Sequence, residues 1–399
     1  MVETEYKNGY YRVCARIDLD ALCSNIQNTR KLLRPQTKIM AVIKADAYGH
    51  GAVPVARALD ALLEGGNPVV AAYGVAMVEE GMELRRAGIT KPILVLGSTA
   101  PELVGEALRN NITLTVYDRA LAEHISKEAV AAGCTAAIHI KLDTGMGRLG
   151  YAGSAADARE VAAIAGLAGI KVEGLFSHMA CADETDKTSA RLQLARYQEF
   201  VQLLAREGIA VPVKHISNSA GIIDMPEAQL DMVRSGISTY GLYPSEEVGH
   251  TKLALMPAME LVSNISFIKQ VGEGTPIGYG STFVAEHPMR VATIPVGYAD
   301  GYPRALSNKG RVLIAGKNAR IIGRICMDQF MVDVTGIPQA KQWDTVTLVG
   351  RDGAESIPVE EPAQLAGSFN YEFVCGISRR VPRVYYRGGM PVCVRTEFA

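Results

Sequence analysis

The 399-residue sequence lacks the features that mark several classes of protein. Its formal net charge is only -1, so bulk electrostatics indicates neither a nucleic-acid partner nor an anionic membrane partner. No uninterrupted apolar run reaches the length needed to cross a membrane. The seven cysteines are scattered and form no C-x-x-C pair, which disfavours a disulfide framework or a zinc site and favours a reducing compartment.

The first residues, MVETEYKNGYYRV, contain no apolar segment of the kind found in a secretory signal. We therefore expect a cytoplasmic protein. Hydrophobic residues make up 48% and charged residues 21% of the chain, which is ordinary for a globular protein. A length of 399 residues allows two domains with sizeable cores.

Short apolar segments alternate with helix-like stretches between about residues 17 and 250. Apolar side chains in 18–33 recur at three- and four-residue spacings, which predicts an amphipathic helix. Eight segments that suit strands buried on both faces follow it: 38–44, 71–76, 92–97, 112–117, 135–142, 170–178, 213–218 and 231–241. Crossover helices between eight strands predict an α/β fold, a (β/α)8 TIM-like barrel over 17–250, with a doubly wound open sheet as the alternative.

The character of the sequence changes after residue 250. Segments rich in β-branched residues are separated by Gly, Pro, Asn and Asp, and long helical patterns are nearly absent. These segments are 258–271, 290–297, 311–316, 319–334 and 344–350. They predict a second, mostly antiparallel β domain over 251–399, with 243–257 as the crossing between the domains.

Polar residues stand at the carboxyl ends of the predicted strands, where barrels concentrate their chemistry. Taken singly, each has an ordinary interpretation: a snorkelling lysine, a hydrogen-bonded core histidine, a solvated arginine or a helix cap. Their recurrence at the same end of the predicted barrel favours a common site. The residues are Lys44, Arg148, His178, Asn218, Ser219, Arg234, Gly236 and Ile237.

These residue types suit a phosphorylated aldehyde. A lysine amine in an apolar site has a lowered pKa and attacks aldehydes, which would make Lys44 a nucleophile. Small residues and backbone N–H groups near Ser219, Gly236 and Ile237 suit a phosphate, and Tyr48 adds a hydroxyl donor. Aldehyde and phosphate together indicate pyridoxal 5'-phosphate, held as an imine on Lys44.

Eight motifs, in family order and covering nearly the whole chain from about residue 10, make the sequence similar to the bacterial alanine racemases. They are AVIKADAYGHG, KLDTGMGRLG, SNSAG, VRSGISTYG, GYGSTF, IPVGYADGY, GRICMDQFMVDV and ISRRVPRVYY. The resemblance implies interconversion of L-alanine and D-alanine, with D-alanine supplied for peptidoglycan. It also implies a β domain that takes in an N-terminal strand within 1–16. The family forms head-to-tail homodimers in which the partner's β domain completes each active site.

The resemblance also implies catalytic roles. Lys44 resembles the lysine that holds the cofactor and serves as one of two acid–base groups, and Tyr279 resembles the second, contributed by the other subunit. Arg234 matches the arginine that faces the pyridine nitrogen. Arg148 matches the residue near the cofactor's phenolic oxygen and the substrate carboxylate. We expect His178, in contact with Tyr279 and Arg234, to tune the tyrosine.

The remaining matches concern cofactor and substrate binding. The phosphate positions correspond to Tyr48, Ser219, Gly236, Ile237 and Tyr371, and we include Asn218 and His178 in the cofactor-binding set. Met327 matches the partner-subunit residue whose backbone N–H meets the substrate carboxylate, and Tyr298 and Arg324 match positions that line the entrance. Lys141 matches a lysine that is carbamylated in some members. Asp46 stands where many relatives have asparagine.

Three other interpretations stay open at this point. One is a PLP-dependent decarboxylase of the same architecture, one is a serine or broad-specificity racemase, and one is a non-catalytic PLP carrier. The β domain, with Tyr279 and Met327, separates racemisation from the carrier. The histidines outside the motifs, His124, His139 and His250, are interpreted as surface or packing residues.

Overall fold

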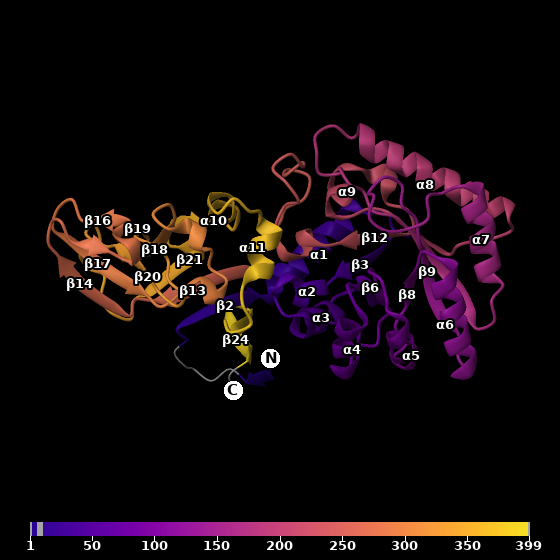
Figure 1. Ribbon diagram of the computed structural model, residues 1–399, viewed down its shortest axis with the longest axis horizontal. Helices are drawn as coiled ribbons and strands as arrows, with labels where there is room; N and C mark the ends of the chain where they lie inside the picture. Colours follow the sequence, from indigo (N-terminus) through magenta and orange to yellow (C-terminus); the bar gives the residue numbers. More distant parts are fainter. Residues whose placement is uncertain (1, 6–10, 398–399) are drawn as a thin grey trace. The chain divides into compact units, whose positions relative to one another are not determined.

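The computed structural model describes residues 2–5 and 11–397 (Figure 1). They divide into two compact units. The barrel unit contains Ala21–Ala47 and Ala52–Met256. The β unit contains the chain up to Asp20, the short segment Tyr48–Gly51, and the chain from Pro257 onward. No helix of the described chain is long and apolar enough to cross a membrane.

Parallel strands of the barrel unit overlap all eight segments predicted from the sequence. They are β3 (Lys38–Val42), β6 (Val70–Val75), β7 (Ile93–Val95), β8 (Leu114–Val116), β9 (Ala136–Lys141), β10 (Ile170–Phe176), β11 (Val213–His215) and β12 (Met232–Ser235). They pair in the orders β12-β3-β6-β7 and β11-β10-β9-β8. Backbone bonds from Val95 N to Thr113 O and from Arg234 N to Ser217 O, both 3.0 Å, join the two sets into a ring. The predicted TIM-like barrel is confirmed.

The strand segments are apolar because both of their faces are covered. Every residue of β7 and β8 is buried, as are Ile138 and Ile140 of β9. Helices lie outside the strands (Figure 1). They are α1 (Leu19–Leu32), α3 (Ala52–Asp60), α4 (Val78–Arg86), α5 (Pro101–Arg109), α6 (Arg119–Ala131), α7 (Ala155–Ala165), α8 (Thr188–Arg206) and α9 (Ser219–Asp224).

Local sequence signals explain where several of these helices begin. Asp118 accepts a hydrogen bond from the backbone N–H of Leu121 at the start of α6, at 2.8 Å. Ser154 and Asp157 form a reciprocal capping box at the start of α7. Such caps satisfy backbone N–H groups that have no partner inside the helix. They fix the lengths of the loops that connect strands to helices.

The β unit is built on one long sheet that contains, in the described residues, twelve strands. The path is β1-β24-β23-β2-β13-β21-β18-β19-β20-β17-β14, with β22 paired to β21. Its strands are β1 (Val2–Glu5), β2 (Val13–Asp18), β13 (Met259–Asn264), β14 (Phe267–Val271), β17 (Met289–Ile294), β18 (Arg311–Ile314), β19 (Lys317–Ile322), β20 (Phe330–Asp333), β21 (Thr345–Asp352), β22 (Glu355–Ile357), β23 (Arg383–Arg387) and β24 (Met390–Thr396). Only β2 and β23 pair in parallel within this sheet, as far as the described residues go. The predicted, mostly antiparallel β domain is confirmed.

The segment Tyr48–Gly51 belongs to the β unit because its backbone is bonded there. Arg383 Nε donates to the carbonyl of Gly49, and Tyr385 Oη donates to the carbonyl of His50, each at 3.0 Å. A Cβ on Gly49 would lie 2.2 Å from the Val374 carbonyl oxygen, and one on Gly51 would lie 1.9 Å from Tyr385 Oη. The two glycines of the first motif are therefore required by close packing.

Candidate active site

Lys44 opens an unusual turn directly after the first barrel strand. The segment α2 (Lys44–Tyr48) has left-handed backbone angles, with φ of 52° at Ala45, 51° at Asp46, 55° at Ala47 and 53° at Tyr48. A left-handed conformation costs an L-residue roughly 1–2 kcal/mol. A run of such residues persists only where surrounding contacts enforce it, and strained segments of this kind cluster at functional sites.

Two carboxylates hold this turn in place. Glu80, in the first turn of α4, accepts the backbone N–H of Ala45 through Oε1 and that of Ala76 through Oε2, both at 2.7 Å. Asp46 Oδ1 accepts the N–H of Ala52 at 2.8 Å. An asparagine at position 46 would offer the same oxygen, so the departure from the common family residue leaves this bond available. The importance of Glu80 was not predicted from the sequence.

Four cations gather around His178 at the carboxyl end of the barrel. Burial lowers the pKa of His178 well below its usual range, and the charges of Arg234, Arg148, Lys141 and Lys44 lower it further. The structure therefore brings together four of the residues predicted from positions at strand ends, and it adds Lys141, which was predicted only from the family resemblance. His178 is neutral in this environment at physiological pH.

Arg234 is the buried centre of this group, with 3% of its surface exposed. Its NH1 donates to His215 Nδ1 at 2.9 Å, and its NH2 donates to the carbonyls of Ser177 and Ile216 at 2.7 and 2.9 Å. NH2 also lies 3.2 Å from His178 Nδ1. Burial lowers the pKa of Arg234 to about 10, so the guanidinium remains protonated at neutral pH.

Lys141 is also buried, with 3% of its surface exposed. Its Nζ donates to the carbonyl of Leu142 at 2.8 Å and lies 5.3 Å from the centre of the Phe176 ring. Burial and the charge of Arg234 lower the pKa of Lys141 to about 8. A lysine with this pKa has an appreciable fraction of neutral amine at neutral pH, the form that reacts with carbon dioxide.

The loop that carries Arg148 is organised by the carboxylate of Asp143. Its Oδ1 accepts the backbone N–H groups of Gly145, Met146 and Gly147 at 2.8 to 3.1 Å, and its Oδ2 accepts that of Arg148 at 2.9 Å. Burial raises the pKa of Asp143, but these four donors outweigh it and lower the pKa below its usual value. The exposed Arg148 side chain thus projects from a fixed backbone.

The predicted phosphate-binding residues of the barrel unit lie together. Ser219 Oγ accepts the backbone N–H of Gly236 at 3.0 Å and that of Ser238 at 3.3 Å. Gly236 immediately precedes a short 3-10 helix, η2 (Ile237–Tyr240). Asn218 caps α9 by accepting the N–H of Gly221 at 3.0 Å, so its side chain has a structural task in this fold.

In the β unit, two predicted phosphate-binding residues pack near each other. The rings of Tyr48 and Tyr371, the latter on α11 (Asn370–Gly376), have centres 6.1 Å apart. Burial, with a smaller contribution from Cys375, raises the pKa of Tyr48 above its usual value. Its hydroxyl therefore stays protonated at neutral pH, the form that donates hydrogen bonds.

Three further predicted residues of the β unit are exposed. Tyr279 is 69% exposed, Met327 is 53% exposed and Tyr298 is 43% exposed. Tyr279 begins the one-turn helix η3 (Tyr279–Ser281), between the paired strands β15 (Pro276–Ile277) and β16 (Phe283–Val284).

Backbone contacts link the loops that carry these residues. The N–H of Tyr298 donates to the Cys326 carbonyl at 3.1 Å, and that of Ala299 donates to the Met327 carbonyl at 3.0 Å. Arg324 packs so closely on Gly280 that a Cβ there would lie 2.9 Å from its NH1. Tyr298 and Met327 therefore belong to adjoining loops, and Arg324 lies beside the turn of Tyr279.

The histidines outside the motifs require one correction. His124 is half-buried and bonds to the Pro101 carbonyl, and His250 stacks on Tyr243, as expected of surface and packing residues. His139 is not a plain packing residue, because its Nδ1 lies 2.9 Å from His215 Nε2 in the buried interior. This pair connects to Arg234, and the sequence offered no signal for a contact between positions 76 residues apart. Within residues 11–397, no group of three or more His, Cys, Asp or Glu side chains could hold a metal ion.

Comparison with known families covers both units. The model described as "Alanine racemase, N-terminal domain" matches residues 17–244, and "Alanine racemase, C-terminal domain" matches 258–385. The chain belongs to the alanine racemase family. The alanine racemase of Desulforamulus reducens is 48% identical over 373 residues, which cover 94% of this chain and 98% of that protein.

Solved alanine racemase structures share the fold. The enzyme from Clostridium difficile 630 has a TM-score of 0.93 at 41% identity and covers 98% of this chain and 100% of its own. The enzyme from Bacillus anthracis with bound L-Ala-P has a TM-score of 0.90 at 34% identity, with coverages of 98% and 99%. The family predicted from the motifs is confirmed.

Proposed function

We propose that this protein interconverts L-alanine and D-alanine with the help of pyridoxal 5'-phosphate. The observation that carries the proposal is the convergence of Lys44, Lys141, Arg148 and Arg234 around His178 in a member of the alanine racemase family. An amine among several cations, beside hydroxyl and backbone N–H donors, is the donor set that an anionic, phosphorylated aldehyde requires.

The residues present fit this cofactor. Lys44 would hold its aldehyde carbon, and Arg234 would face its pyridine nitrogen. The phosphate would be held by Ser219, Gly236 and Ile237, with Asn218 fixing the start of α9, and by Tyr48 and Tyr371 of the β unit. When bound, pyridoxal phosphate supplies an electron sink that makes the α-proton of alanine acidic.

Racemisation needs one proton-handling group on each face of the α-carbon. The Lys44 amine would take or return the proton on one face, and the Tyr279 hydroxyl of a second copy would do so on the other. A phenol has an unperturbed pKa near 10 and is a poor base. We propose that the cations around His178 lower that value by stabilising the phenolate.

Arg234 supports reaction specificity. Its guanidinium stays protonated and can only donate hydrogen bonds. A pyridine nitrogen that accepts from arginine is disfavoured from gaining its own proton, which limits how much negative charge the ring can take up. The protonated arginine thereby favours return of the α-proton over side reactions.

Substrate recognition would fall to Arg148 and to the backbone N–H of Met327, both directed at the carboxylate. Carbamylation of Lys141 would replace a cation with an anion and so orient Arg148. The lowered pKa of Lys141 supports this modification. Tyr298 and Arg324 would line the entrance, and Tyr371 would crowd the side-chain pocket. Serine adds one hydroxyl to the methyl group of alanine, and an apolar pocket rejects such a small added group only weakly, so slow turnover of serine is expected.

We further propose a head-to-tail homodimer that supplies D-alanine for peptidoglycan in the cytoplasm. The high exposure of Tyr279, Tyr298 and Met327 supports the dimer, because three large apolar residues on adjoining turns are suited to another surface. A small amino-acid-like ligand is consistent with the L-Ala-P bound to the Bacillus anthracis relative.

The test is a polarimetric assay with L-alanine, followed by borohydride reduction and mass spectrometry. We expect loss of optical rotation toward the racemate and a pyridoxyl adduct on Lys44. A yellow protein without racemisation would indicate a PLP carrier, and release of carbon dioxide would indicate a decarboxylase. Equal turnover of L-serine would favour a serine/alanine racemase.

A further inference from the structure

A buried row of side chains leads away from Arg234 through the barrel interior. Arg234 NH1 lies 2.9 Å from His215 Nδ1, and His215 Nε2 lies 2.9 Å from His139 Nδ1. The exposed fractions of Arg234, His215 and His139 are 3%, 0% and 5%. We call these three residues the relay. They come from β12, β11 and β9. The relay therefore depends on the packing of three strands and not on residues adjacent in sequence.

Elementary hydrogen-bond chemistry gives the relay a single direction. An arginine can only donate, so His215 Nδ1 must accept and its proton must sit on Nε2. Nε2–H then donates to His139 Nδ1, which leaves the proton of His139 on its own Nε2. Each group therefore donates away from Arg234. A second proton on His139 would place two N–H groups face to face.

The charges near the two rings favour this neutral arrangement. Burial is the main cause that lowers the pKa of His139 to about 4, Arg234 lowers it further, and Glu173 opposes the shift. Burial also lowers the pKa of His215 well below its usual value, with contributions from Arg234, His139 and Lys141. Both imidazoles are thus neutral at physiological pH.

The surrounding strand is shaped to admit these rings. A Cβ on Gly174 would lie 2.3 Å from His139 Nδ1, so the imidazole lies against bare backbone. Gly174 pairs with His139 where the β9–β10 register shifts, a position typical of glycine at a bulge. The His215 ring stacks on Phe176 with centres 4.9 Å apart and planes 2° apart. Neither ring can turn without displacing its neighbours.

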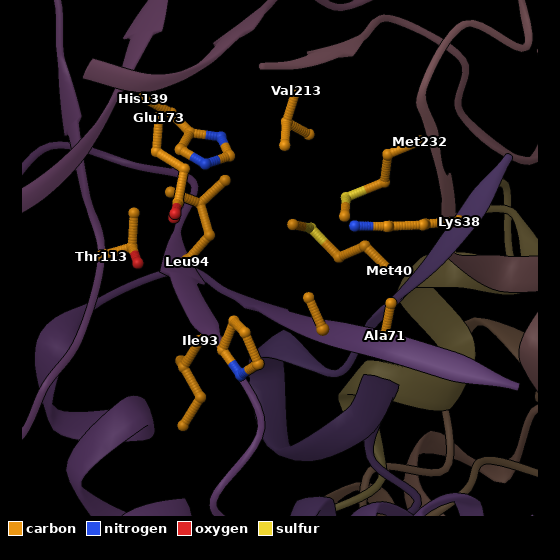
Figure 2. Close-up of a pocket in the computed structure, with 12 residues that line it drawn as sticks. Lys38, Met40, Ala71, Ile93, Leu94, Thr113, His139, Glu173, Val213 and Met232 are labelled. Atoms are coloured by element: carbon orange, nitrogen blue, oxygen red, sulfur yellow. The ribbon is translucent and has the colours of Figure 1, made fainter. Parts of the chain in front are cut away.

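The outer end of the relay reaches a cavity of about 140 Å³ at the amino-terminal end of the barrel. Lys38, Val213 and Met232, the first residues of β3, β11 and β12, line it together with His139 and Glu173. Figure 2 shows His139 and Glu173 on one side of the cavity and Lys38 near Met40 and Met232 on the other. The relay therefore spans the barrel from the cation cluster to this cavity.

We propose that His215 and His139 are positioning residues that hold the Arg234 guanidinium in one orientation as a hydrogen-bond donor. His139 acts at a distance, by giving His215 Nε2–H its acceptor and so stabilising the tautomer that Arg234 needs. This inference rests on the proposed role of Arg234 toward the pyridine nitrogen. The placement of the protons, however, can be measured whether or not the enzyme racemises alanine.

The first experiment is ¹⁵N NMR of the purified enzyme with labelled histidine. We expect the Nδ1 atoms of His215 and His139 to show the shift of an unprotonated nitrogen and both Nε2 atoms that of a protonated one. The ¹⁵N signals that are missing from the spectrum of His139→Asn belong to the two ring nitrogens of His139. A proton on Nδ1 of either residue, or a doubly protonated ring at neutral pH, would overturn the proposal.

Two substitutions at position 139 separate positioning from simple packing. Asparagine places Oδ1 where Nδ1 lies and keeps an acceptor, whereas leucine fills space without one. We expect His139→Leu to disturb the His215 nitrogen shifts and to lower kcat about tenfold with little change in KM, a size common for residues that orient functional groups. His139→Asn should have His215 nitrogen shifts and a kcat close to those of the unsubstituted enzyme. The control is His124→Asn on α6, outside the barrel strands, which should change neither.

Other outcomes contradict the inference. Equal losses in the leucine and asparagine variants would mean that ring volume matters and the acceptor does not. Unaltered His215 shifts in His139→Leu would mean that Arg234 alone fixes the tautomer. If the leucine variant fails to fold, the shifts of the unsubstituted and asparagine proteins still decide the question.

Discussion

The two sets of proposed active-site residues are held in opposite ways. In the barrel unit, Arg234 and Lys141 are each only 3% exposed, and buried bonds fix them. In the β unit, Tyr279 and Met327 are 69% and 53% exposed, and they stand on tight turns that present them outward. The barrel set is complete within one chain. In the proposed dimer, the β-unit set would act against the surface of a second copy.

Among these tests, substitution of Lys44 in the barrel set should reduce racemisation the most. Lys44→Ala would delete both the proposed attachment point of the cofactor and one proposed acid–base group, so we expect racemisation to fall more than about 1,000-fold. Borohydride-trapped pyridoxyl should disappear from position 44. The matched control is Lys38→Ala, a lysine at the start of β3, the strand that precedes Lys44. Comparable losses in both variants would contradict the assignment.

Removing the Tyr279 hydroxyl should impair the β-unit set while leaving the barrel set unchanged. We expect Tyr279→Phe to lower racemisation about 100-fold with cofactor content unchanged. The two enantiomers have equal free energies, so kcat/KM must fall equally in both directions. Exchange of the α-hydrogen for deuterium should nevertheless persist for one enantiomer only, the one that Lys44 deprotonates. Loss of the cofactor, or equal loss of exchange in both enantiomers, would refute the role.

Glu80 offers a smaller and more local test of the barrel set. Glu80→Ala removes the acceptor for the backbone N–H groups of Ala45 and Ala76, and a hydrogen bond to a charged acceptor contributes about 1.5–3 kcal/mol. We expect the left-handed turn to loosen and kcat to fall about tenfold. Glu79→Ala, an exposed neighbour on the same helix, is the matched control. Activity equal to the control would show that the turn does not depend on this carboxylate.

The last effect concerns the pH dependence of stability, leaves activity near neutral pH unchanged, and applies only to the barrel interior. The pKa of His139 is about 4 in the folded chain, against a reference value of 6.5. Between these values the unfolded chain binds a proton that the folded one does not, so stability falls as the pH drops from 6.5 to 4 and levels off below. His139→Asn should lack roughly 3 kcal/mol of this dependence in urea unfolding across that range. If the free energy of unfolding changed equally with pH in the unsubstituted protein and in His139→Asn, the lowered pKa of His139 would be contradicted.

The eight barrel strands could be predicted because a strand buried on both faces is apolar throughout. The proposed site followed from the same reasoning, since Lys44, His178 and Arg234 stand where parallel strands end on one side of a barrel. Their convergence therefore required no knowledge of long-range contacts beyond the order of the strands.

What escaped prediction depends on partners far away in the sequence. The left-handed turn contains Ala45 and Ala47, residues whose intrinsic preference is for the opposite hand, and Glu80 on another helix helps enforce it. His139 meets His215 only because β9, β10 and β11 are neighbours with one particular register. The exchange of Tyr48–Gly51 into the β unit likewise depends on Tyr385 and Arg383, more than 300 positions away.

The most direct test of a site shared between two chains is the activity of a mixture of the two variants. Lys44→Ala and Tyr279→Phe chains, each expected to retain no more than about one hundredth of the activity alone, are unfolded together and refolded, or co-expressed, so that hybrid dimers form. If Tyr279 serves the partner's Lys44, each hybrid has one intact site, and random pairing should restore about one quarter of the unsubstituted activity. If both residues served the same chain's site, every site would lack one group, and mixing would restore nothing.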